Sequence, residues 1–228
     1  MTSQHQHAAA HGLFPVFLKL AGRRVVVVGA GPVAASKIQG LLDAGADVTV
    51  VAPEMHPDIE RAPLVRVRRP FDPGDLEDAW LVVAAATPEV NREVARVAES
   101  RMVFVNAVDD PPNATAYLGG IVRRAGVTFA ISTDGRAPAL AGLLREALDA
   151  VVPADLERWM ATAVQIRPRW IAERVPMEAR RPQLLQALNA IYAGRQDAAA
   201  PAPSRLTRWA DAVFNRRMLQ RWATEVWL

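Results

Sequence analysis

Residues 24–34 read RVVVVGAGPVA, and this stretch decides the fold. Its run of consecutive valines is β-branched and favours a buried strand. Gly29 ends the run, and the residues that follow, as far as Ala44, repeat apolar side chains at helical spacing. A second apolar run, Val48–Val51, comes after Gly45 and closes a strand–helix–strand unit long enough for a parallel crossover. The stretch therefore predicts the start of a parallel α/β sheet.

The turn after the valines fits the pattern G-x-G-x-x-A between a strand and a helix, which is typical of dinucleotide binding. Gly29 permits the tight turn, Gly31 lets the backbone approach a pyrophosphate, and Ala34 lets the helix pack close to the sheet. Pro32 costs little in the first helical turn, where an N–H would lack a partner anyway. We predict that Gly29, Gly31, Pro32, Val33 and Ala34 bind the cofactor; an ordinary glycine turn is the alternative.

The strand–helix rhythm continues along the first half of the chain. Val65–Arg68 has the pattern of an edge strand, Trp80–Ala86 that of a further strand, Asn91–Arg101 that of a helix, and Met102–Val108 that of a fifth strand. This alternation predicts an α/β fold with a doubly wound, Rossmann-type parallel sheet.

The end of the second strand bears on which dinucleotide is bound. The acidic residue usual there is replaced by Ala52 and Pro53; the nearest carboxylate is Glu54, and no arginine is adjacent in the sequence. The sequence therefore predicts NAD rather than NADP, with Glu54 as the candidate ribose partner or else a solvent-exposed loop residue. Thr87, which follows the fourth strand, is a candidate cofactor contact or a plain helix start.

After two consecutive prolines at 111 and 112, the alternation of strands and helices stops. Two strand-like runs, Ala116–Val122 and Val127–Ser132, are joined without a helix between them. Helical patterns then begin at Pro138 and continue over Pro153–Arg169 and Met177–Ala193. The second half of the chain is therefore predicted to be mostly α-helical.

Composition excludes several classes of protein. The chain has 228 residues, no cysteine and a formal net charge of only +3, so disulfides and thiolate chemistry are excluded and nucleic acid is not an expected partner. Its cations are almost all arginine, which suits a ligand with carboxylates. No metal-ligand cluster is visible, and we predict no metal site. Met1–Gly12 lacks a signal-peptide pattern and no apolar run has spanning length, so a cytoplasmic location is expected.

Five segments, one of them the glycine turn at Gly29, together resemble the precorrin-2 dehydrogenase and sirohydrochlorin ferrochelatase family, also found as the N-terminal module of siroheme synthase. Phe14–Leu18 and Ala84–Thr87 flank or follow predicted strands. Asn106–Pro111, NAVDDP, is similar to the family's Asn-Val-Val-Asp-x-Pro, and Ala130–Leu140, AISTDGRAPAL, to its serine-rich loop that opens a helix. The resemblance extends over about residues 13–153.

The resemblance implies NAD-dependent oxidation of precorrin-2, a tetrapyrrole, to sirohydrochlorin, with Fe²⁺ insertion in some members. It also implies a homodimer in which the region after Asn113 exchanges contacts between subunits. Asp109 matches the catalytic residue and would act as a general acid or base. From the sequence alone Asp109 could equally cap the turn before Pro111, a role that suits Asp110 better.

On the substrate side, the resemblance places Ser132 and Thr133 in the cleft, although their hydroxyls could simply cap a helix. Arg123, Arg124 and Arg136 are candidate contacts to substrate carboxylates, or else solvated surface arginines.

Three departures from the family pattern, Ala116, Gly119 and Asp134, touch this substrate side. A non-catalytic NAD-binding sensor or scaffold, or a dehydrogenase of another small molecule, therefore stays open.

Residues 205–228 combine tryptophans and leucines with arginines. They predict an amphipathic helix that docks on the protein or, as the less favoured alternative, meets a membrane surface. The domain organisation that we expect is a flexible tail, an NAD-binding domain, a dimerisation region, a helical domain, a linker and this last helix: 1–12, 13–112, 113–150, 151–194, 195–204 and 205–228.

Overall fold

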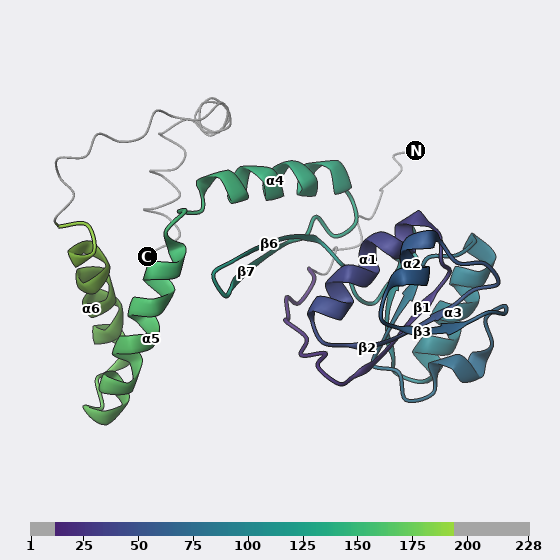
Figure 1. Ribbon diagram of the computed structural model, residues 1–228, viewed down its shortest axis with the longest axis horizontal. Helices are drawn as coiled ribbons and strands as arrows, with labels where there is room; N and C mark the ends of the chain where they lie inside the picture. Colours follow the sequence, from purple (N-terminus) through teal and green to yellow (C-terminus); the bar gives the residue numbers. More distant parts are fainter. Residues whose placement is uncertain (1–11, 194–228) are drawn as a thin grey trace, which may run out of the picture. The chain divides into compact units, whose positions relative to one another are not determined.

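The computed structural model describes residues 12–193, which divide into two compact units (Figure 1). The first unit comprises residues up to 118 together with Asp134–Ala137, and the second comprises Gly119–Thr133 and the residues from Pro138 onward. The predicted tail before Gly12, the linker 195–204 and the final helix 205–228 lie outside the described residues.

The first unit contains a five-stranded parallel sheet in the order β3-β2-β1-β4-β5. The chain starts in the middle of the sheet, runs to the β3 edge, returns, and then runs to the β5 edge, so the doubly wound prediction is confirmed. The strands are β1 (Arg24–Val28), β2 (Asp47–Val51), β3 (Val65–Val67), β4 (Leu81–Ala84) and β5 (Phe104–Ala107). The helices of this unit are α1 (Pro32–Asp43), α2 (Pro57–Arg61) and α3 (Pro88–Ser100), with 3-10 turns η1 (Pro73–Leu76) and η2 (Pro111–Asn113).

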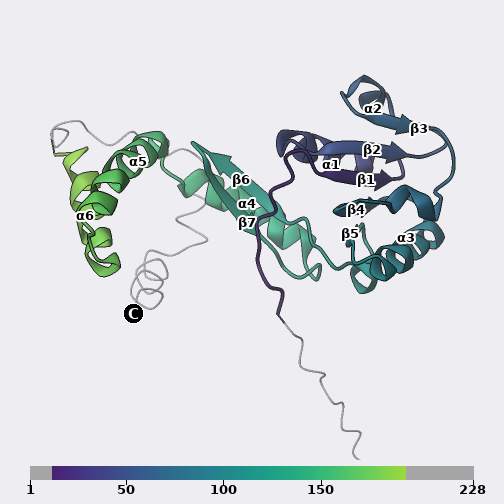
Figure 2. The same cartoon turned by 90° about the horizontal axis from the view of Figure 1, so that it is seen from below.

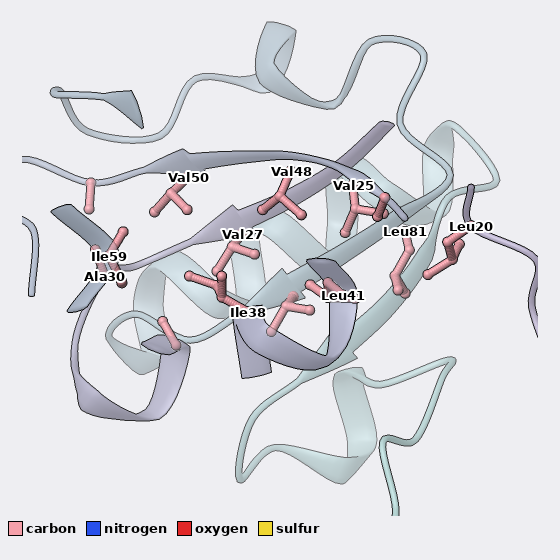
Figure 3. Close-up of a cluster of buried hydrophobic side chains, with 14 residues drawn as sticks. Leu20, Val25, Val27, Ala30, Ile38, Leu41, Val48, Val50, Ile59 and Leu81 are labelled. Carbon is pink, nitrogen blue, oxygen red and sulfur yellow. The ribbon is translucent and has the colours of Figure 1, made fainter. Parts of the chain in front are cut away.

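The valines of β1 explain why the sheet is buried on both faces. Val25 and Val27 pack with the buried side chains of α1 and with Ile59 of α2 (Figure 3). Val26 and Val28 point to the other face and pack with α3. Because both faces of a parallel sheet are covered by helices, the strand is an uninterrupted apolar run rather than an alternating one.

Two features of the first unit differ from the sequence prediction. The short helix α2 was not expected; its first turn is capped by His56, whose Nδ1 accepts from the Asp58 N–H at 3.2 Å. The strand predicted over Ala116–Val122 begins only at Gly120, because Ala116 is fastened to β5 instead. Its N–H donates to the Val105 carbonyl at 2.9 Å, and its own carbonyl accepts from the Asn106 side chain at 2.9 Å. The first unit therefore continues past residue 112.

The second unit begins with an antiparallel hairpin of β6 (Gly120–Arg124) and β7 (Val127–Ile131), joined without a helix as predicted (Figure 2). Ala125 and Gly126 form the turn with φ of 51° and 79°, the left-handed pair that suits the twist of a tight hairpin. The helices α4 (Pro138–Val151), α5 (Leu156–Ala172) and α6 (Met177–Ala190) follow. Within residues 12–193 no helix is long and apolar enough to cross a membrane.

Candidate functional site

The turn after β1 can be built only with glycine. Gly29 has φ +97°, and a Cβ on it would lie 2.2 Å from the Ala85 carbonyl oxygen. Its N–H donates to Val51 at 2.9 Å, and the Ala85 N–H donates to Val28 at 2.8 Å. These bonds hold the ends of β1, β2 and β4 close together around Gly29. The backbone at Gly29 makes the tight turn for which the sequence analysis expected a glycine.

Gly31 occupies the position before α1, and the space beside it is open. A Cβ on Gly31 would meet no atom within 4 Å, and no side chain caps this helix start. Ala34 is fully buried against the sheet, while Val33 remains 47% exposed. Open space in front of the uncapped N–H groups of a helix is where a dinucleotide pyrophosphate binds, so these residues fit the cofactor.

An open cleft of about 490 Å³ lies next to this turn, at the carboxyl ends of β4 and β5. The strand order reverses between β1 and β4, and ligands of doubly wound sheets bind outside the carboxyl ends of the strands at that point. The cleft is lined by Val33, Ala85, Ala86, Pro88, Asn91, Arg92, Val108, Asp109, Asp110 and Asn113.

Asn91 holds the loop on one side of this cleft, and the sequence analysis missed it. The side chain is 4% exposed, and its Oδ1 accepts from the Ala86 N–H at 3.0 Å. The Asn91 N–H donates to the Thr87 carbonyl at 2.9 Å, so both ends of the loop before α3 are fixed. The only sequence signal was an asparagine in the first turn of a helix that follows a strand.

Thr87 is the exposed residue before α3, and its side chain does not cap the helix backbone. The backbone N–H of Glu89 and the Thr87 hydroxyl both hydrogen-bond the Glu89 carboxylate and lower its pKa. Thr87 thus has a local partner at the helix start, and a cofactor contact by Thr87 stays a prediction.

Asp109 and Asp110 follow β5 but have different surroundings. Asp110 precedes η2, and its Oδ2 accepts from the Asn113 side-chain amide at 2.7 Å. Asp109 is exposed in the cleft with φ +55°, and among residues 12–193 its carboxylate has no hydrogen bond or ion pair. The turn is therefore stabilised by Asp110, which leaves the Asp109 carboxylate available to a bound molecule.

Comparisons with known proteins agree with this geometry. Residues 16–120 match a family model described as "Putative NAD(P)-binding". The siroheme synthase of Methylobacillus flagellatus is 41% identical over 158 residues, which cover 67% of this chain and 34% of that protein. Siroheme synthase 3 of Aeromonas hydrophila is 38% identical over 205 residues, which cover 88% of this chain and 44% of that protein. The chain is similar to a part of each of these two siroheme synthases.

The match covers less than half the length of these two siroheme synthases. A solved structure of SirC, precorrin-2 dehydrogenase, has the same fold with a TM-score of 0.59 at 23% identity. That alignment covers 93% of this chain and all of the SirC chain.

Arg136 lies in the first unit together with Asp109. Its loop packs on the segment that follows Asp110: a Cβ on Gly135 would lie 3.1 Å from the Tyr117 ring and 3.2 Å from Pro111 Cγ. Arg136 forms an exposed ion pair with Asp134 at 3.3 Å. Asp134, noted above as a departure from the family pattern, thus has a cation beside it.

The other predicted substrate residues belong to the second unit. Ser132 and Thr133 follow β7, and Arg123 is exposed on β6. The Arg124 side chain binds the carboxyl end of α4. It donates to the Val152 carbonyl and to the Asp149 carboxylate, each at 2.7 Å. A structural function is thereby evident for Arg124, and its substrate contact stays a prediction.

On the ribose side, Glu54 lies exposed in the loop between β2 and α2. The His56 N–H donates to the Ala30 carbonyl at 2.9 Å, which fastens this loop to the glycine turn. Glu54 is therefore positioned beside the cofactor-binding turn, as a ribose partner would have to be.

Proposed function

We propose that this chain oxidises precorrin-2 to sirohydrochlorin with NAD⁺ as the hydride acceptor. The observation that carries the proposal is the unpaired Asp109 carboxylate in a cleft beside the dinucleotide turn. SirC, which has this fold, is named a precorrin-2 dehydrogenase, and the relatives are named siroheme synthases.

The proposed chemistry divides between cofactor and protein. Removing two hydrogens from the substrate as a hydride and a proton balances the reaction, and bound NAD⁺ supplies the hydride acceptor. The backbone at Gly31 and the start of α1 would hold the pyrophosphate, and Glu54 would accept hydrogen bonds from the ribose. Asp109 would take the proton as general base.

The carboxylates of precorrin-2 would be bound by arginine. Arg136 is the candidate that lies in the same unit as the cleft, and its loop packs on Pro111 and Tyr117. Ser132, Thr133, Arg123 and Arg124 complete the proposed substrate side. Of these, Arg124 would have to exchange its bond to Asp149 for the substrate.

We also propose a homodimer formed through the region after Asn113. The second unit leaves large apolar side chains 38–61% exposed on β6, α4 and α5, which a second copy of the chain would cover. These side chains are Ile121, Leu140, Leu143, Val151, Val164 and Ile171. The oligomeric state is measured by sedimentation; a monomer at micromolar concentration would contradict the proposal. The cytoplasmic location likewise stays a prediction.

The deciding experiment is an anaerobic assay of the purified chain with precorrin-2 and NAD⁺, followed by the absorbance of sirohydrochlorin. We expect Asp109→Asn to lower turnover by about 100-fold or more. Asp78→Asn is the matched control, because Asp78 has φ 56° against 55° for Asp109 and is also exposed, but precedes β4. Asparagine tolerates this backbone conformation, so both variants should fold.

Iron insertion is tested in the same cuvette by adding Fe²⁺ or Co²⁺ after the oxidation. Among residues 12–193 there is no group of three or more His, Asp or Glu side chains arranged to hold a metal. A metal-dependent absorbance change above the rate without enzyme would add ferrochelation. NAD binding with no turnover would favour the sensor or scaffold instead.

A further inference from the structure

Arg68 lies beside the loop that would bind the adenosine ribose, although the sequence separates them. β3 pairs in parallel with β2, with Val67 opposite Val51. The pairing continues one residue further, since the Ala52 N–H donates to the Val67 carbonyl at 3.1 Å. Arg68 therefore follows β3 at the level of Ala52, directly before Pro53 and Glu54 in the loop after β2. An arginine in this neighbourhood is what a dinucleotide domain uses to accept the 2′-phosphate of NADP.

The guanidinium of Arg68 is held by Glu60 of α2. Its Nη2 lies 2.5 Å from Oε1 and 2.7 Å from Oε2 of that carboxylate. Arg68 is 54% exposed and Glu60 37% exposed, so the pair is at the surface, where a ligand can reach it.

The hydrogen bonds of the two neighbouring arginines to other groups fix them in place. Arg66 donates to the carbonyls of Ile59 and Leu64 at 2.9 Å and closes the end of α2. Arg69 pairs with Asp75 at 2.5 Å. The Nε of Arg66 also lies 3.7 Å from Oε2 of Glu60, but of these arginines it is Arg68 that hydrogen-bonds the Glu60 carboxylate.

We propose that Glu60 sets the preference for NAD over NADP by holding Arg68. This inference rests on the dinucleotide binding of the proposed function. A 2′-phosphate carries about two negative charges and would have to take Arg68 from Glu60. It would also lie near the carboxylates of Glu60 and Glu54, and like charges repel. The 2′-hydroxyl of NAD is neutral, so it does not have to take Arg68 from Glu60 and is not repelled by the two carboxylates.

The test is the Glu60→Gln variant, titrated with NADH and with NADPH and followed by nicotinamide fluorescence. Glutamine keeps the size and helix preference of the side chain while removing its charge. We expect the native chain to bind NADH more tightly than NADPH. In Glu60→Gln the Kd for NADPH should fall about tenfold, because a charge-assisted hydrogen bond from Arg68 becomes available. The Kd for NADH should change by less than about twofold.

Two further variants separate this explanation from a general change of charge. Asp58→Asn removes the same charge from the same helix, but Asp58 pairs with Arg61 at 2.6 Å rather than with a β3 arginine. It should shift the NADPH affinity by less than about threefold, since the charge is exposed and screened by salt. In the double variant Glu60→Gln with Arg68→Gln, the gain in NADPH affinity should disappear.

The inference is overturned if the native chain binds NADPH as tightly as NADH, or if Glu60→Gln leaves the ratio of the two constants unchanged. It is also overturned if the gain survives the loss of Arg68 in the double variant. Binding of neither dinucleotide to the native chain would overturn the proposed function along with this inference. Binding of NADH without the switch would overturn this inference alone.

Discussion

The two units of this chain bury their apolar side chains to very different extents. In the first, the valines of β1 are at most 2% exposed, and helices pack on both faces of the sheet. In the second, the hairpin contributes only Val122 to the set of buried apolar side chains. The other buried apolar side chains in the described part of this unit are Ala141, Ala147, Val152, Leu156 and Trp170.

The difference shows that the first unit has a complete core, whereas the described part of the second unit, up to residue 193, does not. A two-stranded hairpin is marginal in water unless another surface covers it. In the second unit, hydrogen bonds from side chains connect helices and strands that apolar packing holds together only partly. Arg124 ties β6 to the end of α4, and the Trp159 indole donates to Tyr192, whose hydroxyl donates to Asp155. We therefore expect mutations to act through packing in the first unit and through polar anchors or a partner copy in the second.

The largest expected effect is on the turn at the centre of the first unit. Gly29→Ala places a Cβ 2.2 Å from the Ala85 carbonyl and forces alanine to φ +97°. We expect the free energy of unfolding, measured by urea denaturation, to fall by about 3 kcal/mol or more.

Gly31→Ala is the matched control for that change, because its Cβ meets no atom within 4 Å. It should leave stability within about 0.5 kcal/mol while weakening NADH binding at least about tenfold, since the methyl group enters the space for the pyrophosphate. Equal destabilisation by both alanines would show that the close approach at Gly29 does not decide the turn.

The second effect compares one leucine from each unit. Leu81 of β4 is 2% exposed, whereas Leu143 of α4 is 41% exposed. We expect Leu81→Ala to cost about 3 kcal/mol of unfolding free energy and Leu143→Ala less than about 1 kcal/mol at dilute concentration. If the proposed homodimer forms, the cost of Leu143→Ala should rise with protein concentration. A cost as large as that of Leu81→Ala at every concentration would contradict the contrast between the units.

The third effect tests the polar anchor of the second unit. Arg124→Gln removes the bonds from β6 to Val152 and Asp149, and we expect a loss of about 1 to 2 kcal/mol confined to that unit. Hydrogen exchange should quicken in β6 and α4 and stay unchanged in β1 and β4. Arg123→Gln, at an exposed neighbouring position on the same strand, should leave all of these rates unchanged. Faster exchange in the first unit would mean that the units are not independent.

The smallest effect concerns the acid stability of the first unit. Burial by itself would raise the pKa of Asp75, but hydrogen bonds from Arg69 and the Asp72 N–H outweigh it and hold the pKa below its ordinary value. A lowered carboxyl pKa in the folded state stabilises the fold above the unfolded pKa of about 3.9, and this stabilisation is lost as the pH falls through the lowered value.

Asp75→Asn should therefore lower the urea midpoint at pH 7, and the midpoints of variant and native chain should converge below about pH 4. Asp47→Asn, exposed at the start of β2, should show no such difference. A constant gap between Asp75→Asn and the native chain at both pH values would contradict the contribution of the ion pair.

Local patterns were enough to predict the glycine turn, the parallel sheet and the hairpin. A β-branched run, a G-x-G-x-x-A spacing and a helical period are encoded over a few consecutive residues, so they are readable without the fold. The helix α2 has five residues and is too short to display a period, which is why it was missed. Similarly, the strand predicted from Ala116 starts later because its backbone bonds with Val105 and Asn106 depend on a distant segment.

The sequence by itself determined the turn that fits a dinucleotide and, through resemblance, the importance of Asp109. Only the tertiary structure decided that Asp110 accepts a hydrogen bond from Asn113 while Asp109 has no hydrogen-bond partner within residues 12–193. Sheet pairing likewise decided that Arg68 lies beside the loop of Glu54, where the sequence had shown no adjacent arginine. The parallel register of β2 and β3 brings together residues that are far apart in the sequence. A sequence pattern does not show which of these residues become neighbours in space.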